Sequence, residues 1–246
     1  MPRGLTRTIA AADADPHASE FPSRARRRGL GYLAIGLVAY AVALIAGWPA
    51  RYLIDADPRW VLSGTIWHGE AVLDGAYRVE WRWAPFRSLA NLGFAADWRM
   101  TGSGTDLAGS GVARRRSLLL EGVSGQADAA LLGALTRDLP STCDAALTVD
   151  LPRMLFDGAK SSVEGEVRSD PGSCASGAER MPIPALVMRA TRDGAGVSTA
   201  TLAPLTQPRV KLVEASFAGG RLIVAPTRTG IALLPFLRNW RIERDW

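Results

Sequence analysis

The sequence predicts a mainly β protein, with an antiparallel, curved or sandwich-like sheet that follows one N-terminal transmembrane helix. Residues 29–50 contain no charged side chain. The segments after them alternate apolar with polar or small residues, as strands with one buried face do. Short turns separate these segments, which leaves no room for the crossovers of a parallel sheet. The pattern does not decide whether the sheet is closed or open.

The uncharged run, residues 29–50, directly follows an arginine-rich segment, residues 24–28. An apolar helix of about 19 residues measures roughly 28 Å, close to the hydrocarbon thickness of a bilayer. Positive charge stays on the cytoplasmic side of a membrane. We therefore expect residues 1–28 to form a disordered cytoplasmic tail and residues 51–246 to form a domain on the other side. In a bacterium this means an inner-membrane anchor and a periplasmic domain.

Two other interpretations of residues 29–50 are a cleaved secretory signal and a buried core helix. Signal cores run about 7–15 residues, and cleavage after Ala46 would place Leu44 at a position that requires a small residue. A buried helix of a soluble domain usually carries a polar stripe, and this segment has none. We therefore expect a single-pass, uncleaved anchor.

Charge is concentrated at the N-terminus. The chain has a net charge of +5, of which residues 1–28 supply +3 from six arginines and three acidic residues. This basicity marks membrane topology, so no nucleic-acid partner is expected. The run Arg114-Arg115-Arg116 could meet lipid phosphates or an acidic partner, but so short a run between apolar segments is most simply a solvated turn.

Cys143 and Cys174 are the only cysteines of the chain. A lone pair in an oxidising compartment is most simply one disulfide, and two buried free thiols are the alternative. A zinc site is disfavoured, because no Cys-x-x-Cys occurs and the two histidines, His17 and His68, lie far away in the sequence. No metal or other cofactor is expected.

Period-two alternation marks the predicted strands, in residues 77–83, 92–100, 145–151, 163–167 and 205–217. Turn dipeptides separate apolar runs at Gly69-Glu70, Asp74-Gly75, Asp157-Gly158, Asp193-Gly194 and Gly219-Gly220. One further helix is expected over Ser124 to Leu139, where four leucines share a face and Pro140 supplies the stop.

Catalytic motifs are missing from the sequence. His68 is the only histidine after the predicted anchor, in a predicted turn, and no motif supplies it with an acid or a nucleophile. The run from Gly102 to Leu107 lacks the last glycine of a dinucleotide fingerprint and is expected to be a loop. No phosphate-binding loop or nucleophile elbow occurs. We expect neither enzymatic activity nor a small-molecule substrate.

Three short segments form a series: Trp48-Pro49-Ala50, then residues 62–71 (LSGTIWHGEA), then Trp81-Arg82-Trp83-Ala84-Pro85. They resemble type II secretion system protein N. Members of that family tend to carry Gly-Thr-x-Trp-x-Gly-x-Ala soon after the membrane helix, then a Trp-containing strand that ends at proline. The matching residues here are Gly64, Thr65, Trp67, Gly69, Ala71 and Pro85. The long Arg- and Ala-rich tail before the helix departs from the family pattern.

The same residues can be interpreted without the family. Alternation predicts a strand in which Thr65 and Trp67 share one face and Ile66 the other, while Gly69 allows a reversal into the next strand. Four tryptophans are most simply sheet-packing residues, since aromatic side chains dominate core energetics. The other interpretation is that they line a groove for a partner or a lipid. The four tryptophans are Trp67, Trp81, Trp83 and Trp98.

The resemblance implies a non-enzymatic inner-membrane component of the type II protein secretion system. Such a protein would contact other inner-membrane or periplasmic subunits of the machinery. A second hypothesis is a periplasmic carrier or bridge for lipid, which requires a continuously apolar concave face on the sheet. A hydrolase that uses His68 ranks last.

Overall fold

The computed structural model describes residues 23–52, 57–135, 142–158, 161–176, 179–193, 197–238 and 240–245. The chain divides into two compact units, Met1–Gly47 and Trp48–Trp246. Most of the predicted cytoplasmic tail, residues 1–22, lies outside the described residues.

The first unit contains the helix α1 (Ser23–Ala46). Its side chains from residue 32 to residue 45 are uncharged, and its large apolar ones, among them Leu33, Leu37 and Val42, are exposed. Within the part of the chain that the structure describes, no helix is both long enough and apolar enough to cross a membrane.

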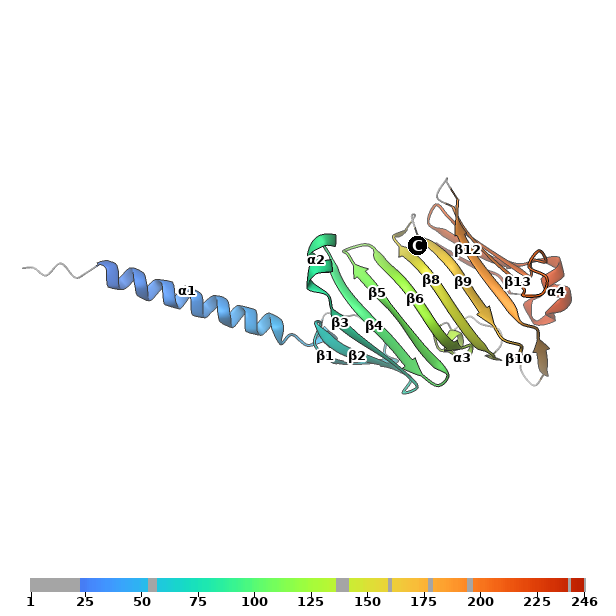
Figure 1. The fold of residues 1–246 in the computed structure, drawn as a ribbon, viewed down its shortest axis with the longest axis horizontal. Coiled ribbons are helices and arrows are strands. Elements are labelled where there is room, and N and C mark those ends of the chain that lie inside the picture. Colours follow the sequence, from blue (N-terminus) through green and yellow to red (C-terminus); the bar gives the residue numbers. More distant parts are fainter. Residues whose placement is uncertain are drawn as a thin grey trace, which may run out of the picture. The chain divides into compact units, whose positions relative to one another are not determined.

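The second unit is built on one antiparallel sheet of 13 strands that does not close (Figure 1). The prediction of a mainly β, antiparallel fold is therefore confirmed. A short 3-10 helix, η1 (Ala50–Tyr52), precedes the sheet. In sheet order the strands are β1 (Trp60–Gly64), β2 (His68–Leu73), β3 (Tyr77–Trp83), β4 (Phe94–Gly102), β5 (Thr105–Ala113), β6 (Leu118–Asp128), β8 (Ala146–Phe156), β9 (Ser162–Ser169), β12 (Leu186–Arg192), β13 (Ser198–Pro204), β14 (Val213–Ala218), β15 (Arg221–Pro226) and β16 (Ile242–Asp245).

Three strands form a second, small sheet in the order β11-β10-β7: β7 (Thr142–Asp144), β10 (Gly172–Ser176) and β11 (Glu179–Ile183). Cys143 and Cys174 face each other across β7 and β10. The two residues are joined by a disulfide, with their Cα atoms 4.0 Å apart. The predicted pairing is thus present in the structure.

Short helices connect several strands: α2 (Pro85–Asn91), α3 (Ala130–Leu135), α4 (Arg228–Leu233) and the 3-10 helix η3 (Pro235–Leu237). Pro85 ends the strand before it and also begins α2, because proline suits the first turn of a helix. Thr227 caps α4 by accepting a hydrogen bond from the Gly230 N–H at 3.0 Å.

The predicted helix from Ser124 to Leu139 is wrong over its first part. Residues 124–128 belong to β6, which pairs with β5 on one side and β8 on the other. Two ladders of backbone hydrogen bonds outweigh the weak helical pattern there. The helix is confirmed only as α3, and residues 136–140 lie outside the described part.

Two further local predictions are wrong. Gly69-Glu70 is not a turn but lies inside β2; the chain reverses over residues 65–67 instead, where the Thr65 N–H donates to the His68 carbonyl at 2.8 Å. The predicted strand 205–217 begins only at Val213. Pro208 interrupts its first half, which forms a turn-rich connection. Among the turn signals, Gly194 lies outside the described residues.

The main core lies on one face of the 13-stranded sheet, which we name the apolar face. It carries alternate residues of successive strands, such as Met100, Leu107, Val123, Val149 and Val213. The opposite face carries a small separate cluster made by Ala95, Val112 and Leu119. On β4 and β5 alternation explains the two clusters, since neighbouring side chains point to opposite faces. On β6 a register shift opposite Ala108 to Ser110 places Leu119 and Val123, four residues apart, in different clusters.

Candidate functional site: an aromatic edge and an apolar cavity

The first candidate is the beginning of the sheet, where β1 is an edge strand. Among the described strands of this sheet, β1 pairs with β2 alone. Its sequence, WVLSG, contains no charge and no proline. The Val61 side chain is 67% exposed, and Ser63 is also exposed.

Three aromatic rings gather next to this edge. The ring centroids of Trp67 and Trp83 lie 4.5 Å apart at an interplanar angle of 60°. The Trp67 ring also lies 6.3 Å from that of Phe94. Tilted pairs at such distances are favourable contacts between aromatic rings. All three side chains are half-buried. We name β1 together with Trp67, Trp83 and Phe94 the aromatic edge.

Trp81 stabilises the chain reversal beside this cluster. Its indole Nε1–H donates to the Ile66 carbonyl at 3.0 Å. Gly69 lies opposite Trp81 in the ladder between β2 and β3, and the indole packs where a side chain at Gly69 would stand. The predicted family-like residues therefore form one local structure. Its function in this structure is to fix the path of the chain from β1 to β2.

Trp98 occupies a different environment from the other three tryptophans. It is the register partner of Trp81 on β4, and its ring packs on Gly109 of β5. A Cβ atom at Gly109 would stand 3.0 Å from the indole, which explains the glycine there. The Trp98 Nε1 atom is buried and has no hydrogen-bond acceptor among the described residues. Trp98 contributes to the wall of the cavity described below.

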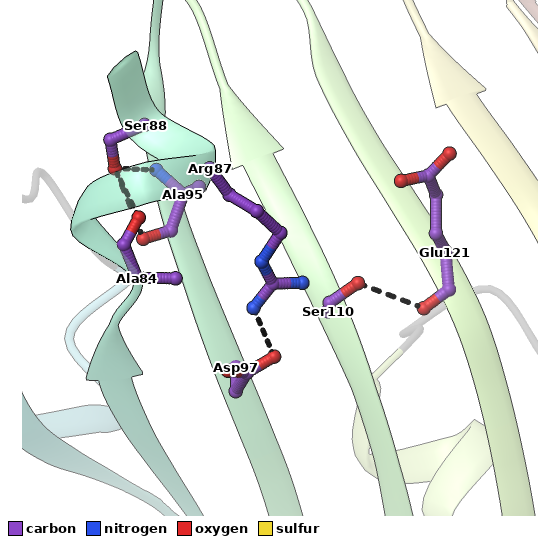
Figure 2. A network of polar contacts seen from close by, with 7 residues as sticks. All are labelled: Ala84, Arg87, Ser88, Ala95, Asp97, Ser110 and Glu121. Atoms are coloured by element: carbon purple, nitrogen blue, oxygen red, sulfur yellow. Dashed lines mark hydrogen bonds and ion pairs between the residues drawn. The ribbon is translucent and has the colours of Figure 1, made fainter. Parts of the chain in front are cut away.

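Ser88 of α2 connects the aromatic edge to β4, and Figure 2 shows its hydroxyl between Ala84 and Ala95. Its hydroxyl accepts hydrogen bonds from the Trp83 indole at 2.8 Å and from the Ala95 N–H at 2.9 Å, and it donates to the Ala84 carbonyl at 2.9 Å. Ala95 is fully buried, so its N–H needs this partner. Nearby, Arg87 forms an ion pair with Asp97.

His68 lies where β2 begins, and its side chain is exposed. Within the described residues, no hydrogen bond or ion pair reaches its ring. A shallow hollow of about 470 Å³ beside it is lined by charges of both signs, including Glu80, Arg82 and Arg99. Arg99 also binds Asp106 through two hydrogen bonds, of 2.8 and 2.6 Å, and thereby lowers the pKa of that carboxyl group. Among the residues that the structure describes, no hydrogen bond joins the His68 ring to an acid or a nucleophile in the way that a catalytic base requires.

Metal ligands do not gather either. In the part of the chain that the structure describes, no group of three or more His, Cys, Asp or Glu side chains could hold a metal ion.

The second candidate is a cavity of about 1120 Å³ on the apolar face. Its walls come from neighbouring strands of the large sheet, from β4 through β15. Residues of α3 and of the small sheet complete the lining, together with Leu234, Leu237 and Trp240, and the disulfide belongs to it. None of the described residues in the lining is charged, and the side-chain hydroxyls among them belong only to Ser169 and Thr201.

Sequence reasoning did not identify this cavity. The alternation that marks the strands does select the lining residues, for example Leu147, Val149 and Leu151 on β8. Alternation alone, however, cannot distinguish a filled core from a hollow one. That difference depends on which distant segments cover the face.

No family model, curated protein or solved structure matches this chain. The residues and their geometry are therefore the basis for a functional assignment.

Proposed function

We propose that this protein is a non-enzymatic inner-membrane component of the type II protein secretion system, which acts through periplasmic protein contacts. The observation that carries the proposal is the aromatic edge. It combines an edge strand that carries no charge and no proline of its own with a cluster of aromatic rings, and it coincides with the residues that resemble secretion protein N, Gly64 to Pro85.

The two edges of the sheet differ in a way that supports this role. Edge strands usually carry charges, prolines or bulges that prevent another chain from pairing with them. β16, at the far edge, has the sequence IERD, which is largely charged, whereas β1 has the uncharged sequence WVLSG. Pro49 bridges Thr65 just beyond the end of β1, and the uncharged strand itself suits the addition of a partner strand, where backbone hydrogen bonds supply affinity.

Trp67 and Trp83 suit the same kind of contact. Both are half-buried, so part of each side chain is accessible to a partner; Trp67 lies in the reversal that follows β1, and Trp83 lies on β3 in contact with it. A few aromatic residues commonly carry most of the binding energy of an interface. A partner strand on β1 could use these rings to select its side chains.

The proposed location rests on the arginine cluster and the uncharged run in residues 24–50. A phosphatase active only in the periplasm, fused after Trp246, should be active. Fractionation should recover the intact chain in the inner membrane. A soluble periplasmic form that begins near Gly47 would instead identify a cleaved signal.

The contact role is tested with Val61→Lys, which places a charge on the open edge. We expect secretion to fall while the protein accumulates normally, because Val61 is exposed and contributes little to the core. Leu205→Lys is the matched control, since Leu205 is an exposed apolar residue outside the aromatic edge. It should leave secretion unchanged.

A photoreactive benzoylphenylalanine at Ser63 provides a direct readout in cells that assemble the secretion system. Under the proposal it forms adducts with identified inner-membrane or periplasmic subunits of the machinery, and Val61→Lys removes them. Normal secretion by Val61→Lys, together with no such adduct, would contradict the proposal.

A further inference from the structure

We infer that the apolar cavity binds an acyl chain of a membrane phospholipid. This inference goes beyond the proposed function, which concerns the edge of the sheet and not its face. It starts from the size of the hollow. Native cores contain few voids larger than one water molecule, whereas this cavity measures about 1120 Å³. That exceeds the range of roughly 300–1,000 Å³ typical of small-ligand pockets.

The lining specifies an apolar occupant. An ordered water needs two to four polar partners, and the side chains around this cavity are almost entirely Leu, Val, Ala, Met and Ile. Because the described part of the lining carries no charge, a polar ligand in contact with it would lose its hydration without gaining hydrogen bonds. A hydrocarbon chain needs no hydrogen bonds and loses no favourable hydration, so its burial there carries neither of these costs.

The position of the cavity argues against a peptide. Its walls are interior strands such as β8 and β13, each of which pairs with a neighbour on both sides. Their backbone donors and acceptors are engaged in these ladders. An extended peptide laid across them would bury its own N–H and C=O groups without partners, which is costly.

The shape of the lining fits a chain better than a compact ring system. Lining residues follow one another across the sheet from Trp98 on β4 to Val224 on β15, and neighbouring strands lie about 4.8 Å apart. An acyl chain can bend to follow a lining that is spread over these strands, whereas a rigid ring system cannot. Met154 and Met188 line it, and methionine side chains adapt readily to a flexible ligand.

We take a membrane phospholipid as the source of the acyl chain, and this choice rests on the proposed membrane anchor. The exposed side chains of α1 from residue 32 to residue 45 are uncharged, as expected for a helix that meets hydrocarbon rather than water. A chain held at a membrane has phospholipid as its nearest supply of acyl chains.

The test uses the full-length chain in vesicles of phosphatidylethanolamine and phosphatidylglycerol. A small fraction of the phospholipid carries a photoreactive diazirine near the end of one acyl chain. After irradiation, adducts are mapped by mass spectrometry. We expect adducts on cavity residues such as Met154, Met188 and Leu202, in addition to α1. Adducts on α1 alone, or on the opposite face of the sheet, would overturn the inference.

Variants that fill the cavity refine the test. Ala200 and Ala215 face each other across β13 and β14, and both are half-buried in the cavity wall. We expect Ala200→Phe with Ala215→Phe to reduce cavity labelling roughly tenfold, since excluding about two methylene groups from apolar contact has that effect. Ala108→Phe, an identical change at an exposed position of β5, should leave labelling unchanged.

Thermal unfolding shows whether the filled variant is folded; if it is not, the adduct map of the unaltered chain decides alone. If a diazirine fatty acid labels the cavity and the phospholipid does not, the ligand is a free fatty acid, and the assignment of a phospholipid is overturned. Benzoylphenylalanine at Ala200 that captures a polypeptide in cells would overturn the inference in favour of a protein occupant. Each of these results is separable from the secretion test, because none involves the aromatic edge.

Discussion

The indole of Trp81 takes the space that a side chain at Gly69 would need. The two residues face each other across β2 and β3. A Cβ atom at Gly69 would overlap the Trp81 ring, and it would also stand 2.8 Å from the carbonyl oxygens of Ser63 and Thr65. Glycine is required here for room rather than for a turn. The indole can then reach the Ile66 carbonyl and hold the preceding reversal.

Gly69→Ala should therefore destabilise the protein, although alanine is usually no worse than glycine in a strand. We expect a loss of about 1–3 kcal/mol in the free energy of unfolding, the usual range for overpacking. Chemical denaturation of the full-length chain measures it. Gly133→Ala is the control, because an added Cβ there meets nothing within 4 Å. Equal stability of Gly69→Ala and the unaltered chain would show that Trp81 does not depend on this glycine.

Trp67→Ala separates packing from partner binding at the aromatic edge. Core tryptophans cost about 3–5 kcal/mol when truncated, but this ring is only half-buried, so we expect the lower end of that range or less. Secretion should fall by more than the abundance of the protein falls, as measured by immunoblotting. His68→Ala should change stability by less than about 0.5 kcal/mol and leave secretion intact. The opposite pattern, in which only His68→Ala abolishes function at normal abundance, would favour catalysis.

The Cys143–Cys174 disulfide should contribute strongly to stability. It closes a loop with a sequence separation of 31 residues, for which the chain-entropy estimate is about 3–4 kcal/mol. Replacing both cysteines with serine should lower the unfolding free energy by that order and reduce the steady-state level. Mass spectrometry without reduction should find the two peptides linked. Full alkylation of both thiols in unfolded, unreduced protein would contradict the bond.

Glu166 gives the sheet a pH-dependent contribution. Arg189 and Arg168 both donate to its carboxylate, Arg189 at 2.7 Å, and they hold its pKa below the usual range. Because the folded-state pKa is lowered, this stabilisation is present above the unfolded-state pKa and is lost as the pH falls through the folded-state pKa.

Glu166→Gln should therefore reduce stability by about 0.5–1 kcal/mol near pH 7, and the difference should shrink below about pH 4. Denaturation curves at both pH values measure this change. The exposed Glu121→Gln serves as the control, with an effect within about 0.5 kcal/mol. A difference for Glu166→Gln that persists in acid would show that shape, not charge, is responsible.

The strands were the most predictable feature of this protein. Residues 77–83 form β3 as the alternation indicated, because a half-buried strand must place every second residue in the core. The cysteine pair was also predictable, from its number and the expected compartment. Both depend on information that is local or compositional.

Features that depend on distant contacts were not predictable. A glycine between apolar runs has the same appearance whether it permits a turn or makes room for an indole, so Gly69 was assigned the wrong role. Residues 124–128 have no strong preference of their own and become a strand because two neighbours pair with them. The cavity likewise depends on contacts from distant parts of the chain, namely α3, the small sheet and the residues Leu234, Leu237 and Trp240.

The order of the strands has a consequence for how the chain acquires its structure. From β1 to β6, each strand pairs with the one made just before it. Contacts between sequence neighbours form fast, since little loop entropy opposes them. A chain delivered N-terminus first can thus extend its sheet strand by strand as it emerges. Cys143 departs from this order because it must wait for Cys174, so the wall of the cavity beside this pair is completed only after β10 has emerged.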